Sequence, residues 1–283
     1  MANCFLDSEL SDLERDEARA KFRVIPMPLE RTVSYGSGTS KGPFAILEAS
    51  DQLERLCFGI EPCQEGVFTE PGVDCSGPLP EVMERLSERT YNAVKADKIP
   101  VTIGGEHSLT YGAVKGVERA LGRSIGIVQI DAHADLRKAY QNEKHSHASV
   151  MQLLGDEGTR LAQFGVRALC REEVDRRIEL NVFYIDAEEL YLGNINEVAL
   201  PDDFPDDIYV SYDLDGLDPS QMPATGTPVP GGLSYFQSIH IVKSALRGRN
   251  LVGIDVVELA PIENMDGWNF TAAQVTYSLM ALA

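Results

Sequence analysis

The chain has 283 residues, and its 25 lysines and arginines against 44 aspartates and glutamates give a formal net charge of −19. This acidic balance argues against a nucleic-acid-binding protein, which would concentrate basic side chains to neutralise phosphates. No apolar stretch reaches the ~20 residues of a membrane span, and the amino terminus lacks a signal-peptide pattern. Five cysteines without a C-x-x-C pair fit a reducing compartment, so we expect a cytoplasmic protein with no membrane partner and no nucleic-acid partner.

Strand-like apolar runs alternate with amphipathic helical patterns from about residue 21 to the end of the chain. The predicted strands are, in chain order, Phe22–Ile25, Pro100–Ile103, Ser124–Ile130, Ala162–Val166, Asn181–Ile185, Ile208–Tyr212 and Leu251–Val257. The predicted helices are a segment opened by Pro43, Leu79–Val94, Leu109–Leu121, Cys170–Ile178, Ser234–Leu246 and Phe270–Leu282. Several of the strands are continuous apolar runs, which is typical of strands buried on both faces. The alternation therefore predicts an α/β fold with a mostly parallel sheet.

No feature that would mark a domain boundary interrupts this pattern of strands and helices. The sequence has no internal repeat, low-complexity tract or linker, so residues 1–283 are predicted to form a single domain, with residues 1–20 as a candidate amino-terminal extension. Two irregular regions rich in Gly and Pro stand out, Pro28–Pro43 and Asp215–Gly232. A loop as long as the second is either a solvated connection or a functional lid.

Acidic and histidine side chains follow three predicted strands, at the sheet edge where ligands usually bind in open α/β folds. They are Asp131, His133 and Asp135 after the strand ending at Ile130, Asp213 and Asp215 after the strand ending at Tyr212, and Gly104-Gly-Glu-His107 after the strand ending at Ile103. In an extended chain, alternate residues point the same way about 6.5 Å apart, so each cluster can face one cavity. A turn or helix cap would explain any one of these aspartates but not three clusters after three strands.

Four carboxylates crowded together repel one another unless they are protonated or bind cations. Two divalent cations would balance the four negative charges, and two imidazoles would complete the coordination shells. Oxygen ligands with some imidazole and no thiolate favour manganese or a similar ion. Two such ions about 4 Å apart can share a bridging water and supply it as hydroxide near neutral pH, so the clusters predict metal-assisted hydrolysis.

Motifs extend these clusters along nearly the whole chain, from about residue 22 to the end. They are GGEHS at Gly104–Ser108, DAHADLR at Asp131–Arg137, SHASV at Ser146–Val150, SYDLDGLDPS at Ser211–Ser220, PATGTPVPGGLS at Pro223–Ser234 and GIDVVELAP at Gly253–Pro261. In this order they resemble the ureohydrolases, the arginase and agmatinase family of binuclear manganese amidinohydrolases. The resemblance implies an arginase-like fold, which is a three-layer α/β/α sandwich, and assembly as a homo-oligomer, either a trimer or a hexamer.

The resemblance also implies two Mn²⁺ ions per chain and assigns their ligands. One ion would be held by His107, Asp131, Asp135 and Asp213, and the other by His133, Asp131, Asp213 and Asp215. Asp131 and Asp213 would then bridge the two ions.

Three residues are expected to carry the catalytic chemistry. Glu258 matches the family's guanidinium-binding glutamate, and two parallel N–H bonds to it would hold the planar substrate group in place. His147, in SHAS, matches a substrate-binding loop histidine thought to shuttle protons; spacing alone does not separate it from His145, and the motif favours His147. Asp135 could take the proton of the hydroxide and pass it to the leaving nitrogen.

The substrate that the resemblance favours is agmatine, a small cationic guanidino compound cleaved to putrescine and urea. Arginase-like members read the substrate's carboxylate and α-amino groups through an Asn where this chain has Arg137, so the chain is more similar to the agmatinases. Guanidinobutyrate, guanidinopropionate, formiminoglutamate and arginine are the alternatives. The group that would bind the distal amine stays open, with Asp186, Glu188 and Glu189 as acidic candidates.

Two other classes of protein are compatible with parts of this pattern. A non-catalytic regulatory relative would be expected to have lost metal ligands, whereas every expected ligand is present. A binuclear phosphoesterase also uses Asp and His clusters and would need cations for its phosphate, for which Arg137, Lys138 and Lys144 are available. The ordered motifs favour the ureohydrolase over both.

Overall fold

A single parallel sheet forms the centre of the molecule. The computed structural model describes residues 4–283, so the first three residues of the predicted domain and of its amino-terminal extension lie outside the described part. The strands are β1 Phe22–Met27, β2 Val67–Thr69, β3 Ile99–Gly104, β4 Gly126–Ile130, β5 Arg160–Phe164, β6 Phe183–Ile185, β7 Asp207–Asp213 and β8 Asn250–Val257. They lie in the order β2-β1-β3-β8-β7-β4-β5-β6, and all neighbouring pairs are parallel, as the sequence predicts.

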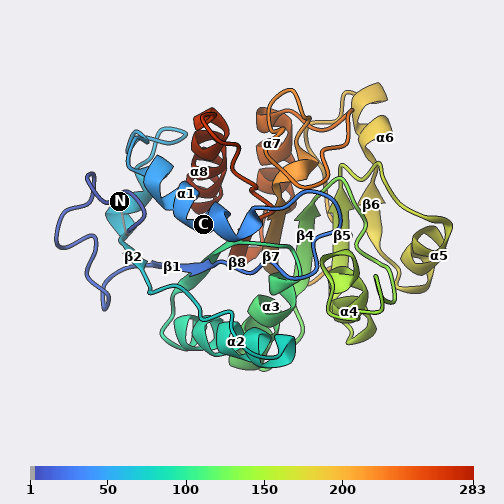
Figure 1. Ribbon diagram of the computed structural model, residues 1–283, viewed down its shortest axis with the longest axis horizontal. Coiled ribbons are helices and arrows are strands. Elements are labelled where there is room, and N and C mark those ends of the chain that lie inside the picture. Colours follow the sequence, from blue (N-terminus) through green and yellow to red (C-terminus); the bar gives the residue numbers. More distant parts are fainter. Residues whose placement is uncertain (1–3) are drawn as a thin grey trace.

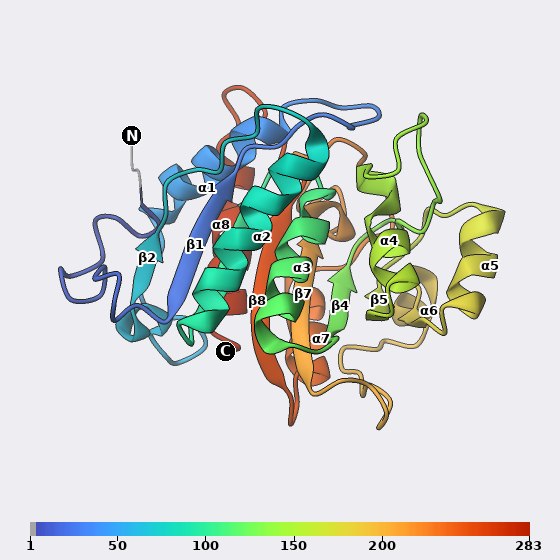
Figure 2. The same cartoon turned by 90° about the horizontal axis from the view of Figure 1, so that it is seen from below.

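Helices cover both faces of this sheet (Figure 1). Their bounds are α1 Gly42–Ser50, α2 Leu79–Lys95, α3 Leu109–Leu121, α4 Val150–Asp156, α5 Arg171–Glu179, α6 Ala187–Leu192, α7 Tyr235–Ala245 and α8 Gly267–Met280. Helices α2, α3 and α4 pack on one face, and α1, α7 and α8 pack on the other (Figure 2). Helices α5 and α6 lie beside β6 (Figure 1). The predicted three-layer sandwich is therefore confirmed.

The longer elements form where their residue patterns predict them. In α2 the stripe Leu79, Val82, Met83 and Leu86 is buried against the sheet, and burial of each such side chain stabilises the fold by about 1.5–3 kcal/mol. Strands β3, β4 and β7 are buried along nearly their whole length, which explains their continuous apolar runs. The sequence interpretation missed β2, α4 and α6, because elements of three to seven residues are too short to show a period.

The described part of the amino-terminal extension packs onto the sandwich. The side chains of Phe5 and Leu6 are fully buried, and Leu10 is nearly so. The backbone N–H of Leu6 donates a hydrogen bond of 2.9 Å to Ser50 Oγ at the end of α1. Among residues 4–283, no helix is long and apolar enough to cross a membrane.

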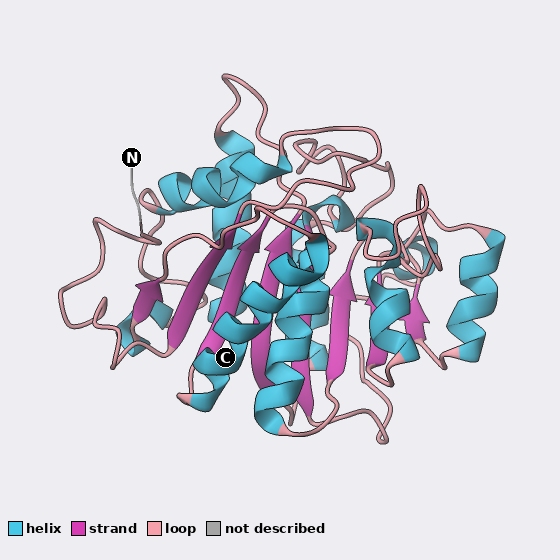
Figure 3. Cartoon of the chain, turned by 60° about the horizontal axis from the view of Figure 1, so that its bottom comes forward, coloured by secondary structure: helices cyan, strands magenta, loops and turns pink. Residues whose placement is uncertain are grey.

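The two irregular regions meet above the carboxyl ends of the strands, where Figure 3 shows the loops gathered. The N–H of Gly36 in the first loop donates to the carbonyl of Gly226 in the second, at 3.1 Å. A Cβ at Gly36 would lie 2.7 Å from the Cα of Gly226, so this contact requires glycine. Arg167 anchors the second loop through hydrogen bonds to the carbonyls of Asp215 and Val229. The two loops thus form a tied cover over this edge of the sheet.

Candidate metal centre

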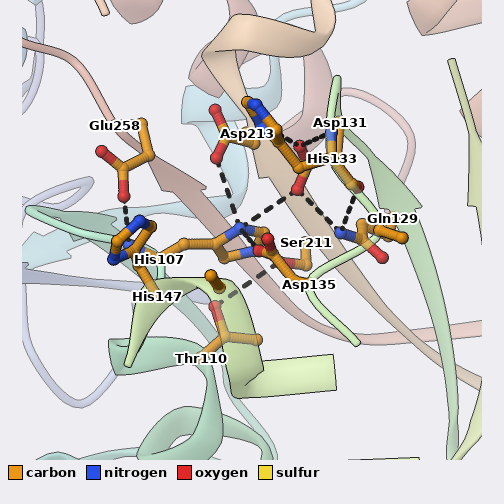
Figure 4. Close-up of polar contacts among 12 residues, drawn as sticks. His107, Thr110, Gln129, Asp131, His133, Asp135, His147, Ser211, Asp213 and Glu258 are labelled. Carbon is orange, nitrogen blue, oxygen red and sulfur yellow. Dashed lines mark hydrogen bonds and ion pairs between the residues drawn. The ribbon is translucent and has the colours of Figure 1, made fainter. Parts of the chain in front are cut away.

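Four adjacent strands, β3, β8, β7 and β4, bring the predicted site residues to one sheet edge (Figure 4). His107 follows β3, Glu258 follows β8, Asp213 ends β7 and Asp131 follows β4. The carboxyl ends of parallel strands meet at one edge, so residues distant in sequence become neighbours. The structure brings all six predicted metal ligands together. Besides His107, Asp131 and Asp213, they are His133, Asp135 and Asp215.

The first group of ligand atoms surrounds the imidazole of His107. Its Nδ1 lies 2.9 Å from Asp135 Oδ2, 3.2 Å from Asp131 Oδ2 and 3.3 Å from Asp213 Oδ2. The other ring nitrogen, Nε2, lies 2.8 Å from the hydroxyl of Ser211, which fixes the orientation of the ring. His107, Asp131 and Asp135 present ligand atoms that all lie within 4.8 Å of one another.

The second group shares Asp131 with the first. His133 Nδ1 lies 3.1 Å from Asp215 Oδ2 and 3.5 Å from Asp131 Oδ1, and these three residues again fall within 4.8 Å. Because the two oxygens of Asp131 face different histidines, the position of Asp131 suits the predicted bridge between two ions. Asp213 contacts His107 of the first group, and its own role as a bridge stays a prediction.

The electrostatics of the cluster fit divalent cations. Burial, together with the neighbouring Asp131 carboxylate, raises the pKa of Asp135 to about 7, and burial raises the pKa of Asp213 well above its usual value. His107 Nδ1 is buried and has no hydrogen-bond partner among the described residues, although three carboxylates face it. Cations would relieve the repulsion between these acids and give that nitrogen a partner. The set of carboxylate and imidazole donors suits manganese.

Two of the predicted catalytic residues are among the ten described residues other than glycine that have a positive φ. Asp135 has a φ of 53° and Glu258 a φ of 68°, in the left-handed region that side chains other than glycine rarely adopt. Such conformations persist where the surrounding structure enforces them, and they cluster at functional sites. The carboxylate of Glu258 accepts a 2.7 Å hydrogen bond from the N–H of His107, and burial raises the pKa of Glu258 to about 8.

His147 begins a short 3-10 turn, His147–Ser149, above the same edge. Its backbone N–H donates to Thr32 Oγ1 at 3.0 Å, and its Nδ1 lies 3.3 Å from the same oxygen. Thr32 Oγ1 in turn lies 2.9 Å from the fully buried carboxylate of Glu106. His145 instead packs edge-on against Tyr111 beside a different cavity. The structure therefore places His147, and not His145, next to the metal ligands.

A narrow cavity of about 180 Å³ leads to the cluster. Its lining includes His133, Asp135, Arg137, Tyr140, His147, Glu173 and Thr227. The three acidic candidates for the distal amine, Asp186, Glu188 and Glu189, are not among the lining residues of the described chain, and Asp186 forms an ion pair with Arg177.

Glu173 is the acidic lining residue that the sequence analysis missed. It lies in the first turn of α5, where its Oε2 accepts the N–H of the N-cap residue Cys170 at 2.8 Å as part of a capping box. Its Oε1 accepts the N–H of Leu136 at 3.1 Å. The spacing of Cys170 and Glu173 at the start of a predicted helix was the available signal. Arg137 covers this carboxylate, with Nε 3.9 Å from Glu173 Oε2, and lies over the ring of Tyr140.

Comparisons with known proteins extend over nearly the whole chain. The sequence model of the Arginase family matches residues 20–282. An N(1)-aminopropylagmatine ureohydrolase of a Synechocystis strain is 34% identical over 98% of this chain and 92% of its own length. A protein with the same name from Thermus thermophilus is 35% identical over 96% of this chain and 92% of its own. The crystal structure of the agmatine ureohydrolase of Thermoplasma volcanium has a TM-score of 0.79 at 28% identity, covering 98% of this chain and 96% of that one.

Proposed function

The chain belongs to the arginase family of ureohydrolases, and on that premise we propose that it is a binuclear manganese enzyme that releases urea from agmatine or from its N(1)-aminopropyl derivative. The observation that carries this proposal is the pair of His and Asp groups joined by Asp131 at the end of a narrow cavity. The family and the hydrolase class follow from the comparisons, whereas the substrate and the metal are what we propose.

The six residues at the edge of the sheet would hold the ions. They are His107, Asp131, His133, Asp135, Asp213 and Asp215. Two divalent cations bound there would lower the pKa of water and so supply a nucleophile at neutral pH, which a resonance-stabilised guanidinium requires.

Glu258 is proposed to bind and orient the guanidinium. Its carboxylate can accept two parallel N–H bonds from the planar group, which fixes the plane relative to the nucleophile. Burial disfavours the charged form of this carboxylate in the free protein, and a cationic guanidinium placed against it restores that form. The hydrogen bond from His107 N–H and the left-handed backbone hold the side chain in this position.

Asp135 and His147 are proposed to move protons. The amine leaves readily only when it is protonated, so a group near the reacting carbon has to deliver a proton to the nitrogen. Asp135 lies beside His107 and lines the cavity, which suits it to take a proton from the attacking water and pass it on. His147 lines the same cavity at the level of the solvent-facing loops, which suits exchange between the site and solvent.

The substrate proposal rests on the cavity and on the relatives. Agmatine and its N(1)-aminopropyl derivative carry a cation, not a carboxylate, at the distal end, and Glu173 places a carboxylate in the cavity wall. The positive charge of Arg137 is partly balanced by Glu173, which leaves it less suited to bind a substrate carboxylate. The aminopropyl derivative is included because two of the relatives above are named for that substrate.

The proposal is tested by measuring urea release from the manganese-loaded protein. Agmatine, N(1)-aminopropylagmatine, arginine, guanidinobutyrate and guanidinopropionate are compared in parallel, and formamide release from formiminoglutamate is measured beside them. We expect one of the first two substrates to have the highest kcat/KM. Release of neither urea nor formamide by the loaded protein would overturn the proposal, and preference for a carboxylate-bearing substrate would overturn its substrate half.

Replacement of Glu258 by Gln provides the matched control for this assay. The amide keeps the shape of the side chain but removes the charge that faces the guanidinium, so turnover is expected to be nearly abolished. Manganese content is expected to stay at the level of the parent, because Glu258 is not among the proposed ligands. Full activity of Glu258→Gln would remove Glu258 from the mechanism.

We also propose that the protein is a cytoplasmic homo-oligomer, a trimer or a hexamer. The five cysteines are all free, which suits a reducing compartment. Large apolar side chains stay exposed on α1, α7 and α8, namely Phe44, Phe236 and Phe270. Light scattering of the purified protein measures the mass of the assembly, and a monomer would contradict the proposal.

A further inference from the structure

A chain of buried polar side chains runs from the proposed bridging carboxylate toward the β6 side of the molecule. Gln129 Nε2 lies 2.7 Å from Asp131 Oδ2, Gln163 Nε2 lies 2.7 Å from Gln129 Oε1, and Arg177 Nε lies 2.9 Å from Gln163 Oε1. These four side chains are at most 3% exposed. Figure 4 shows the inner end, where Gln129 meets Asp131.

The fold places these residues side by side. Gln129 on β4 and Gln163 on β5 are register partners in neighbouring strands, and Arg177 lies in α5 next to them. Gln129 interrupts an otherwise apolar run, and a buried amide destabilises a fold unless its hydrogen bonds are made. The fold therefore tolerates Gln129 at this buried position only because its amide forms hydrogen bonds with neighbouring side chains.

Arg177 and Asp131, at the two ends of this series of side chains, fix the direction of every hydrogen bond in it. A guanidinium only donates and a carboxylate only accepts, whereas a glutamine amide does both. Arg177 donates to Gln163 Oε1, so the amide nitrogen of Gln163 points at Gln129 Oε1 and at the carbonyl of Ala134, 2.7 Å away. The nitrogen of Gln129 is then left for Asp131. A flip of either amide would set donor against donor or acceptor against acceptor.

The outer end of the chain is anchored as well. Arg177 Nη1 forms an ion pair with Asp186 at 2.9 Å, and the guanidinium lies over the ring of Tyr184, 4.3 Å from its centroid. At the inner end, Asp131 Oδ1 accepts the backbone N–H of His133 at 2.6 Å. With Gln129 on Oδ2, each oxygen of Asp131 therefore has its own hydrogen bond, which sets the plane of the carboxylate.

We propose that Gln129, Gln163 and Arg177 are positioning residues that orient the Asp131 carboxylate so that its two oxygens serve two manganese ions. This inference rests on the metal centre of the proposed function but not on any substrate. None of the three side chains is among the predicted ligands, and Arg177 reaches Asp131 only through both glutamines. Partners of this kind around metal ligands typically alter metal affinity roughly 10- to 100-fold.

The experiment is a calorimetric titration of the metal-depleted full-length protein with Mn²⁺, carried out for the parent and four variants. Gln129→Leu is expected to weaken manganese binding about 10- to 100-fold, and Arg177→Met to weaken it several-fold. Arg177→Lys keeps a donor-only cation at the outer end and is expected to bind more tightly than Arg177→Met. Arg176→Met is the matched control, because Arg176 is the neighbouring residue of α5. Its partners, Gln152, Asp156 and Glu179, do not belong to the series of hydrogen bonds that reaches Asp131.

Thermal unfolding of each metal-free variant shows which variants are folded. If Gln129→Leu does not fold, the comparison of Arg177→Met with Arg176→Met decides. Equal manganese affinity of Arg177→Met and the parent, or equal losses in Arg177→Met and Arg176→Met, would overturn the inference. A parent that binds manganese as expected but releases neither urea nor formamide would overturn the proposed function and leave this inference supported by the same titration. A parent that binds no manganese would overturn both.

Discussion

The hydroxyl of Thr32 connects the loop Pro28–Pro43 to the proposed proton-transfer group. Glu106 accepts hydrogen bonds from the N–H of Thr32, from the hydroxyl of Thr32 and from that of Ser108, so its carboxylate faces donors only. The Thr32 hydroxyl must therefore donate to Glu106, and its oxygen is left to accept from His147. This favours a proton on His147 Nδ1 and leaves Nε2 as the nitrogen that exchanges protons.

We therefore expect Thr32→Val to lower kcat roughly 10- to 100-fold, which is less than complete loss of a general acid–base would cost, about 10²–10⁴, because His147 itself is retained. KM is expected to change little, because Thr32 is not among the residues that line the cavity in the described chain. Thr32→Ser keeps the hydroxyl and should retain most of the activity. Ser40→Ala removes a comparable hydroxyl–carboxylate bond, to Glu30, elsewhere in the same loop and should leave kcat unchanged. An equal loss of kcat in Thr32→Val and Ser40→Ala would mean that the Thr32 hydroxyl only keeps the loop ordered and does not orient His147.

A substitution at Asp213 tests whether the proposed metal centre needs the negative charge of this side chain or only its shape. Its Oδ1 accepts the N–H of Asp215, while its Oδ2 faces His107. Asparagine can keep the first contact but removes one negative charge, so Asp213→Asn is expected to lower manganese content sharply and activity by more than about 100-fold. Asp218→Asn, in the loop that follows β7, is the control, because Asp218 accepts hydrogen bonds from the N–H groups of Ser220, Gly231 and Gly232 and faces no histidine of the cluster. Two tightly bound ions in Asp213→Asn, measured by elemental analysis, would contradict its role as a ligand.

The turn between β3 and α3 sets the distance between the loop Pro28–Pro43 and the site. The backbone of Leu29 passes so close to Gly105 that a Cβ there would lie 2.1 Å from the Leu29 carbonyl oxygen. Hydrogen bonds join the two segments, from Glu106 N–H to Leu29 O and from Gly105 N–H to Met27 O. The side chain of Glu106 reaches Thr32 only because this approach is so close.

Replacement of Gly105 by Ala should therefore separate the loop from the turn. We expect the variant to lose about 1–3 kcal/mol in the free energy of unfolding, as overpacked interiors do, together with most of its activity. Gly267, the first residue of α8, has open space around it and an ordinary φ, so Gly267→Ala serves as the control and should be neutral. Urea denaturation of both variants measures the difference. A Gly105→Ala protein as stable as the parent would show that the turn can move.

At the scale of elements, the sequence predicted what is local and repetitive. The apolar period of α2 and the runs of β4 and β7 are visible without any knowledge of the fold, and so is the two-residue spacing of Asp131, His133 and Asp135. The resemblance of ordered motifs to the ureohydrolases is confirmed by the family match. Contacts between distant segments could not be predicted, because no spacing relates Thr32 to His147 or Arg177 to Asp131.

At the scale of the whole molecule, the proposed ions replace protons in a buried cluster. In the metal-free chain the pKa of Asp135 is raised to about 7 and that of Glu258 to about 8, mainly by burial. Burial opposes the shift of His133, but the charges of Asp215 and Asp131 raise its pKa to about 12. Each of these groups binds protons more tightly when folded than when unfolded, so each favours the folded state at low pH.

The sign of the pH dependence follows for the metal-free protein. As pH rises from about 5 to 8, Asp135 and Glu258 lose protons that the unfolded chain has already released near pH 4, which removes stability. The contribution of His133 begins to fall above its ordinary pKa of about 6.5, because the unfolded imidazole then loses its proton while the folded one keeps it. All three contributions therefore decline in the same direction over this range.

Manganese bound at the proposed site is expected to reverse this loss, because it would bind the deprotonated carboxylates and neutral imidazoles of the folded chain. Its stabilisation grows with the ratio of free ion to dissociation constant, and that constant falls as protons leave the ligands. We therefore expect the increase in Tm on adding manganese to be small at pH 5 and to rise steadily to pH 8. Differential scanning fluorimetry at fixed free Mn²⁺, with magnesium as the matched ion, measures this increase. The same increase at every pH would show that the cations do not compete with protons in this cluster.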